Sequence, residues 1–171
     1  AKQIETMRGK LNWCGKIDLV AHSQGGLDAR AYLRDLGDKA KDQVRSLTMI
    51  ATPNHGTVGA DWRNLYWKLR LNPDKCTPWL TPGWVERFDT NTPLVDGVKY
   101  YTVAGLMKYS PFSLKKDRIG SLFVNGEDDG VVPVKSVHLD GAESLGVFPY
   151  GHNELVTKED VYNAVKSKID P

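Results

Sequence analysis

Short apolar runs, each closed by turn residues, alternate with amphipathic or longer irregular stretches along this chain. Runs of this length are typical of buried strands. They predict strands at 16–21, 44–51, 100–104 and 119–125. After the first run, Leu27, Ala31 and Leu36 lie near one face of a predicted helix over 27–36. Gly37 stands where the C-cap of that helix belongs.

The last predicted helix runs from about 158 to 169. Thr157 and Asp160 have the spacing of a capping box at its start. A mostly apolar stripe follows at Val161, Ala164, Val165, Lys168 and Ile169. Strands separated by helices or long excursions favour a mostly parallel sheet with helices on both faces, which is an α/β fold. We predict one such domain over 1–171.

The stretch from about 57 to 97 does not follow this alternation. It is rich in proline and contains most of the tryptophans of the chain: Trp62, Trp67, Trp79 and Trp84. An insertion of this length is usually a functional cover or disordered, and so many aromatic residues argue against disorder. Two interpretations are open, a small satellite core or a lid whose apolar underside covers a pocket.

Composition excludes some classes of function. The 171 residues are 40% hydrophobic and 26% charged, as in an ordinary globular domain. The net charge of +2 is small and the basic residues are scattered, so we expect no nucleic-acid partner. No apolar run approaches the roughly 20 residues that cross a bilayer. Cys14 and Cys76 are too far apart for a metal knuckle, and either one disulfide or two free thiols fits them.

The segment Ala21-His22-Ser23-Gln24-Gly25 joins the first predicted strand to the helix after it. This context is that of a nucleophile elbow, in which strained backbone angles hold a serine hydroxyl clear of the sheet edge. The residues two before and two after the serine must be small, because strand and helix approach closely there. Alanine and glycine meet this condition, although glycine is the commoner first residue. We predict Ser23 as the nucleophile, and an N-cap serine is the structural alternative.

A serine nucleophile needs a histidine to take its proton and a carboxylate to orient that histidine. In this arrangement the chain order is Ser, then Asp or Glu, then His. Asp129 follows the run at 119–125 and stands directly before Gly130, on a loop at the same sheet edge as the elbow. We predict Asp129 as the acid, with Asp128 as the alternative.

The base is chosen from four histidines. His152 follows the acid and lies in the loop before the last helix, so we predict it as the base. His138, closer to the acid in the chain, is the alternative. His22 lies inside the elbow and cannot fold back on the serine, so we expect it to line or support the pocket. His55 precedes the acid and is not assigned.

These residues predict ester cleavage through a covalent acyl-enzyme, with the backbone N–H of Gln24 as one donor to the oxyanion. The tryptophan-rich insertion favours an apolar acyl or lipid substrate and transient contact with a lipid interface. Two alternatives stay open. The same residues could pass the acyl group to an alcohol or amine, as in an acyltransferase. The chain could also be a non-catalytic fragment that binds a lipid or a partner.

Three segments of the chain resemble secreted bacterial triacylglycerol lipases of the α/β-hydrolase superfamily. They are 16–30 around the elbow, 50–57 after the second strand and 125–133 around the acid. The resemblance extends from about 10 to 156 and is weakest across the insertion. It implies the α/β-hydrolase fold with a lid, carboxylic ester hydrolysis, secretion and, once more, Asp129 as the acid.

The sequence also departs from that family. The family's fold begins with several strands upstream of the elbow, and a His-Gly loop there gives the second oxyanion N–H. Here one helix precedes the elbow strand, so we expect a missing N-terminal segment or a second chain to complete the fold. Some members place a calcium carboxylate where Glu154 stands, two residues after His152. A lone glutamate is usually solvated, so we predict no metal and no required cofactor.

Overall fold

Four strands form one parallel sheet in the computed structural model, which describes residues 2–57, 77–107 and 127–170. They are β1 (Ile17–His22), β2 (Val44–Ile50), β3 (Lys99–Gly105) and β4 (Glu143–Phe148), and their order across the sheet is the order in the chain. All neighbours pair in parallel. The carboxyl ends of the strands therefore meet at one edge of the sheet, and the prediction of a parallel α/β fold is confirmed.

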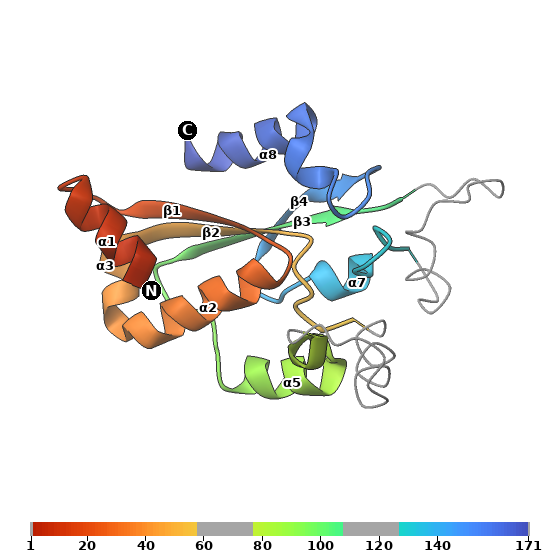
Figure 1. Cartoon of the computed structure of the whole chain (residues 1–171), viewed down its shortest axis with the longest axis horizontal. Coiled ribbons are helices and arrows are strands. Elements are labelled where there is room, and N and C mark those ends of the chain that lie inside the picture. The colour runs from red at the N-terminus through yellow and green to blue at the C-terminus, as the bar shows by residue number, and fades with distance from the viewer. Residues whose placement is uncertain (1, 58–76, 108–126, 171) are drawn as a thin grey trace.

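Helices cover both faces of this sheet, with α2 and α8 on opposite sides (Figure 1). The helices are α1 (Lys2–Lys10), α2 (Gln24–Leu36), α3 (Ala40–Gln43), α5 (Pro82–Thr90), α7 (Val134–Val137) and α8 (Glu159–Ile169). Short 3-10 turns are η1 (Gly37–Lys39), η2 (Thr77–Leu80) and η3 (Leu155–Thr157). Leu33 of α2 shares a core with Leu47 and Met49, whereas Val161 of α8 shares another with Ile50. Side chains of β2 thus alternate between the two faces, as the pleat requires.

Most predicted elements are present with shifted ends. The helix predicted from 27 begins at Gln24, directly after the elbow serine, and ends as expected at Gly37. Gly37 has a φ of 57° and its N–H donates to the carbonyls of Leu33 and Arg34. The strand predicted at 119–125 lies outside the described residues.

Strand β4 was not predicted. It is one of the two outer strands of the described sheet, and none of its residues is fully buried. Gly146 interrupts its apolar residues with a φ of 130°, and the register with β3 shifts beside it. An edge strand that is only half covered does not need a continuous apolar run, so the sequence lacks the usual signal.

The capping box predicted for the last helix is wrong. Thr157 belongs to η3, and its hydroxyl donates to the carbonyl of Glu154 at 2.8 Å instead of to α8. Asp160 accepts the Tyr150 hydroxyl at 2.9 Å, and Lys158 occupies the N-cap position without a side-chain cap. The preceding 3-10 turn displaces the start of α8 by one residue, which removes the spacing that a capping box needs.

The described part of the insertion contains η2 and α5, whereas Trp62 and Trp67 lie outside the described residues. The ring of Trp79 stacks on Trp84 with centroids 6.4 Å apart, and Trp84 stacks on Phe88 at 5.4 Å. Trp79 is nevertheless 51% exposed. This end of the insertion is a stack of aromatic rings on η2 and α5, and its role as a lid stays a prediction.

A buried arginine fastens α5 to the rest of the fold. Arg30 of α2 is 3% exposed, and its guanidinium lies 5.2 Å from the centroid of the Phe88 ring. It forms an ion pair with Asp89 at 2.8 Å and donates to the Thr92 carbonyl at 3.2 Å. It also donates to the side-chain oxygen of Asn54 at 3.3 Å. Helix α2 therefore holds both α5 and the loop after β2 through one charged group.

Replacing this arginine should destabilise the fold. In Arg30→Leu, Asp89 and the fully buried Asn54 lose their donor, so we expect the free energy of unfolding to fall by about 3 kcal/mol. Arg34→Leu on the same helix is the matched control, because Arg34 is 40% exposed and pairs with its neighbour Asp35. That change should cost less than about 1 kcal/mol. Urea unfolding followed by circular dichroism measures both, and equal losses would contradict the anchoring role.

Candidate active site

The predicted nucleophile stands in a strained turn between β1 and α2. Ser23 has φ 55° and ψ −133°, a conformation that residues with a side chain rarely adopt. Its N–H donates to the Ile50 carbonyl at 2.9 Å, and its own carbonyl accepts the hydroxyl of Thr52 at 2.9 Å. The end of β2 and the loop after it thus hold the turn from both sides. The Thr52 contact was not foreseen, because its two residues are far apart in the chain.

The structure brings Ser23, His152 and Asp129 together. The Ser23 Oγ lies 2.9 Å from Nε2 of His152, and Nδ1 of His152 lies 2.8 Å from Oδ2 of Asp129. A carboxylate only accepts, so Nδ1 carries the proton and Nε2 is free to accept the serine hydroxyl. The Asp129 side chain is fully buried and that of His152 is 10% exposed. This is the geometry that activates a serine.

Asp129 is fixed on its other oxygen as well. Its Oδ1 accepts the N–H groups of Val131 and Val132 at 3.0 and 2.7 Å. Three donors therefore orient the carboxylate, two from its own loop and one from His152. The neighbouring Asp128 points its Oδ1 at the N–H of Gly130, at 2.6 Å. The geometry favours Asp129 over Asp128 as the partner of the imidazole.

The other three histidines lie in different surroundings. His138 is 63% exposed and contacts Asp140 at 3.1 Å, away from the serine. His55 is 53% exposed and faces α5. His22 lies against His152, with its Nε2 2.9 Å from the backbone oxygen of that residue. Of the four, His152 alone has a hydrogen bond to Ser23 within the part of the chain that the structure describes.

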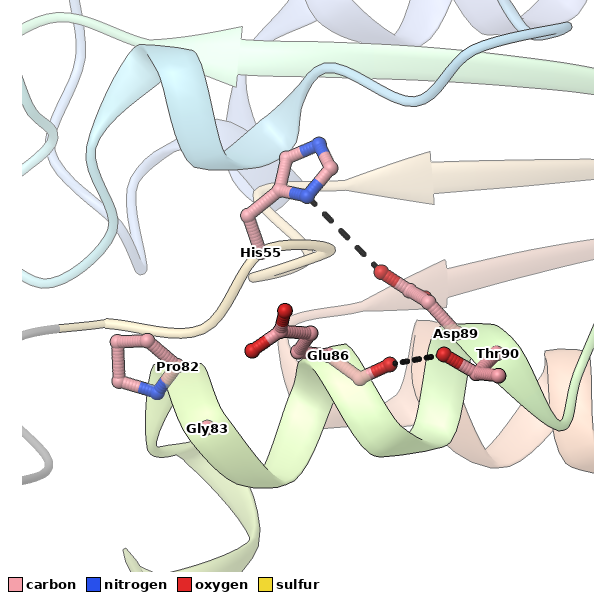
Figure 2. A pocket seen from close by; sticks show the side chains of 6 residues that line it. All are labelled: His55, Pro82, Gly83, Glu86, Asp89 and Thr90. Atoms are coloured by element: carbon pink, nitrogen blue, oxygen red, sulfur yellow. Dashed lines mark hydrogen bonds and ion pairs between the residues drawn. The ribbon is translucent and has the colours of Figure 1, made fainter.

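A cavity of about 470 Å³ opens between the loop after β2 and α5 (Figure 2). Its lining residues are His55, Pro82, Gly83, Glu86, Asp89 and Thr90. Nδ1 of His55 lies 3.9 Å from Oδ2 of Asp89 across it. No local sequence pattern indicates this cavity, because its two walls come from segments that are separated in the chain.

Comparison with known proteins finds lipases that this chain resembles. No model of a protein family matches the sequence. Triacylglycerol lipase 2 of Saccharomyces cerevisiae is 33% identical over 94 residues, which are 50% of this chain and 28% of the yeast protein. The mature lipase BlEst2 of Bacillus licheniformis has a TM-score of 0.79 at 23% identity, over 98% of this chain and 69% of that one. The Staphylococcus hyicus lipase has a TM-score of 0.68 at 15% identity, over 92% and 70%.

The chain has the α/β-hydrolase fold. The similarity to bacterial lipases that the sequence suggested is confirmed by these structures. The chain spans little more than a quarter of the length of the yeast relative, so that protein's activity is not carried over by the match alone.

Gln24 is the first residue of α2. The N–H groups of the first turn of a helix have no acceptor inside the helix, and they lie at the positive end of its dipole. The Gln24 N–H is adjacent to Ser23, at the position predicted for an oxyanion donor. This arrangement suits a negative charge that develops beside the serine.

Gly26, and not Gly25, is the glycine that the close packing of the elbow requires. A Cβ built on Gly25 would lie 3.9 Å from the Cβ of Ala21, which is ordinary contact and leaves room for one methyl group. A Cβ on Gly26 would lie 2.1 Å from Oγ1 of Thr52. The tightest approach is therefore one residue later than the sequence motif indicates, between α2 and the loop that holds the serine carbonyl.

Among the residues that the structure describes, no three His, Cys, Asp or Glu side chains are placed to hold a metal ion. No helix in that part of the chain is long and apolar enough to span a membrane. Glu154 accepts the N–H of Gly151 at 3.0 Å and so braces the loop of His152. The absence of a required metal or cofactor stays a prediction. Cys14 is exposed and Cys76 lies outside the described residues, so their pairing is untested.

The crowding at the elbow yields a prediction about stability. Gly26→Ala would push a methyl group into Thr52, so we expect the free energy of unfolding to fall by about 1–3 kcal/mol. Gly25→Ala is the matched control and should change the free energy of unfolding by less than about 1 kcal/mol. Its new methyl group would be at ordinary contact distance from Ala21, and alanine favours the helix. Chemical denaturation of both variants measures the difference. If Gly26→Ala leaves the free energy of unfolding unchanged, α2 and the loop after β2 are packed less closely than the structure shows.

Proposed function

We propose that this chain carries the acyl-transfer machinery of a carboxylic ester hydrolase that acts on lipid esters. The observation that carries the proposal is the hydrogen-bonded series from Ser23 Oγ through His152 to Asp129, with contacts of 2.9 and 2.8 Å. The fold does not require a hydrogen bond between a histidine and the strained serine at the start of the helix. A serine, a histidine and an aspartate in series are the arrangement expected of a nucleophile with its base.

The reaction proceeds in two halves. As Ser23 Oγ attacks the ester carbonyl carbon, His152 Nε2 takes the hydroxyl proton and Asp129 stabilises the imidazolium. The N–H of Gln24 donates to the oxyanion of the tetrahedral intermediate. The intermediate collapses, His152 returns the proton to the leaving alcohol, and an ester of Ser23 remains. His152 then deprotonates a water that attacks this ester, and it returns the proton to Ser23 Oγ as the carboxylic acid leaves.

The substrate class rests on the surroundings and the relatives. The similar proteins named above are lipases, including a triacylglycerol lipase. The stack of aromatic rings formed by Trp79, Trp84 and Phe88 gives the insertion a large apolar surface. Both favour acylglycerols or similar lipid esters over small polar esters. Secretion and transient contact with a lipid interface stay predictions.

We also propose that an N-terminal segment or a second chain completes the site. Within the described residues β1 pairs on one side only, and Val20 on it is 49% exposed. An unpaired strand edge offers N–H and carbonyl groups to a further strand. In α/β-hydrolases the second oxyanion N–H comes from a loop that follows a different strand. A strand added beside β1 could bring such a loop to the same sheet edge as Ser23.

The test is hydrolysis of p-nitrophenyl esters with short and long acyl chains. We compare this chain with a form extended at its N-terminus, each with and without Ser23→Ala. We expect the extended form to turn over, this chain alone to be about a hundredfold slower or worse, and Ser23→Ala to lower kcat by a thousandfold or more, on the order seen for such nucleophiles. If the alanine variant stays equally active, the proposal is wrong and a binding function takes its place.

A second pair of variants separates the two aspartates. Asp129→Asn should lower kcat by about 10⁴-fold, because an amide does not stabilise the imidazolium and can favour the wrong tautomer. Asp128→Asn should lower it less than about tenfold, since an amide oxygen can still accept the Gly130 N–H. Steady-state kinetics with circular dichroism as the folding control measures this. The reverse order of effects would assign the acid to Asp128.

A further inference from the structure

His22 makes a contact that the reaction as described does not use. It is the last residue of β1 and directly precedes Ser23. Its Nε2 lies 2.9 Å from the backbone oxygen of His152, although the two residues are 130 positions apart in the chain. The two imidazole rings also lie against each other, with centroids 4.6 Å apart and planes inclined by 44°. One side chain of the elbow strand therefore touches both the backbone and the ring of the base.

The direction of this hydrogen bond is determined by its acceptor. A carbonyl oxygen cannot donate, so the proton is on Nε2 of His22. Burial lowers the pKa of the His22 imidazole below its usual value, and the neighbouring His152 lowers it further. At neutral pH the ring is thus uncharged, with its one N–H committed to His152. A neutral donor holds the carbonyl without opposing the positive charge that His152 gains during the reaction.

The backbone of His152 is held at both of its polar groups. Its N–H donates to the carbonyl of Asp129 at 2.9 Å, and its carbonyl accepts from His22. The first bond fixes the base to the loop of the acid, and the second fixes it to the strand of the nucleophile. His152 lies in the connection between β4 and η3, outside any regular element, so no helix or strand fixes its position. These two bonds act together with Glu154, which braces the same loop through the N–H of Gly151.

We infer that His22 is a positioning residue, which holds the loop of the base against the elbow strand so that the His152 imidazole stays within hydrogen-bonding distance of Ser23. The inference rests on the proposed function, since it concerns the same site. Its physical reason is that His22 and Ser23 are adjacent in the chain. Because residue 22 is bonded directly to Ser23, a hydrogen-bond donor on its side chain fixes the position of His152 relative to the nucleophile.

Two substitutions separate the donor from the ring. His22→Phe keeps a ring that packs on His152 but removes the N–H, whereas His22→Gln keeps an N–H at about the reach of Nε2 and removes the ring. In the form that hydrolyses esters, we expect His22→Phe to lower kcat by about 10- to 100-fold with KM changed less than about twofold. His22→Gln should recover kcat to within about fivefold of the parent. His138→Phe is the matched control, because His138 is exposed and pairs with Asp140, and it should leave kcat unchanged.

The outcomes are distinguishable. If Ser23→Ala keeps its activity, the proposed function has failed whatever His22 does. If Ser23→Ala is inactive but His22→Phe matches the parent, or if His22→Gln is as slow as His22→Phe, the positioning role is overturned. A measurement on the unsubstituted protein covers the case in which His22→Phe does not fold. Imidazole ¹⁵N shifts at neutral pH should show His22 as the Nε2–H tautomer, and an Nδ1–H tautomer would overturn the inference.

Discussion

The close approach of β1, α2 and the loop after β2 is the constraint on which the rest of the site depends. It forces Ser23 to a φ of 55°, a strain of about 1–3 kcal/mol for a residue with a side chain. That strain is offset where the bonds to Ile50 and Thr52 satisfy the serine's backbone groups. It is tolerated only because Gly26 leaves room for the side chain of Thr52. A serine exposed at a helix start is thus a consequence of tertiary packing, and the local motif only permits it.

The parallel sheet brings three of the functional segments to one edge. Ser23 follows β1, Thr52 follows β2, and the loop with His152 follows β4. Gly105 at the end of β3 lets these loops close together, since a Cβ there would lie 2.7 Å from the Tyr150 carbonyl and 2.8 Å from Cβ of Asp129. Acid and base reach the serine across a strand end that carries no side chain.

The sequence predicted what is encoded locally and missed what is encoded across the chain. Ser23 and Asp129 were predicted from short motifs and His152 from its place in a required order, and the structure brings all three within hydrogen-bonding reach. Strand β4 was missed because a half-covered edge strand has no continuous apolar run. The capping box at Thr157 failed because a 3-10 turn competes for the same residues. No local pattern could indicate that His22 donates to His152 or that Arg30 holds α5, since each partner is chosen by the packing of distant segments.

Backbone hydrogen bonds explain how such a fold persists while the sequence changes. Past the last paired residues of the strands, Ala51 donates to Val103 and Leu106 to Phe148, both at 2.8 Å, and His152 donates to the carbonyl of Asp129. These bonds need no particular side chain, so they hold the loops in place for almost any sequence that buries the same cores. The fold is accordingly shared with the lipase structures at 23% and 15% identity. Specific residues are then required only where the backbone cannot act, at the glycines that allow close approach and at the few side chains that donate or accept within the site.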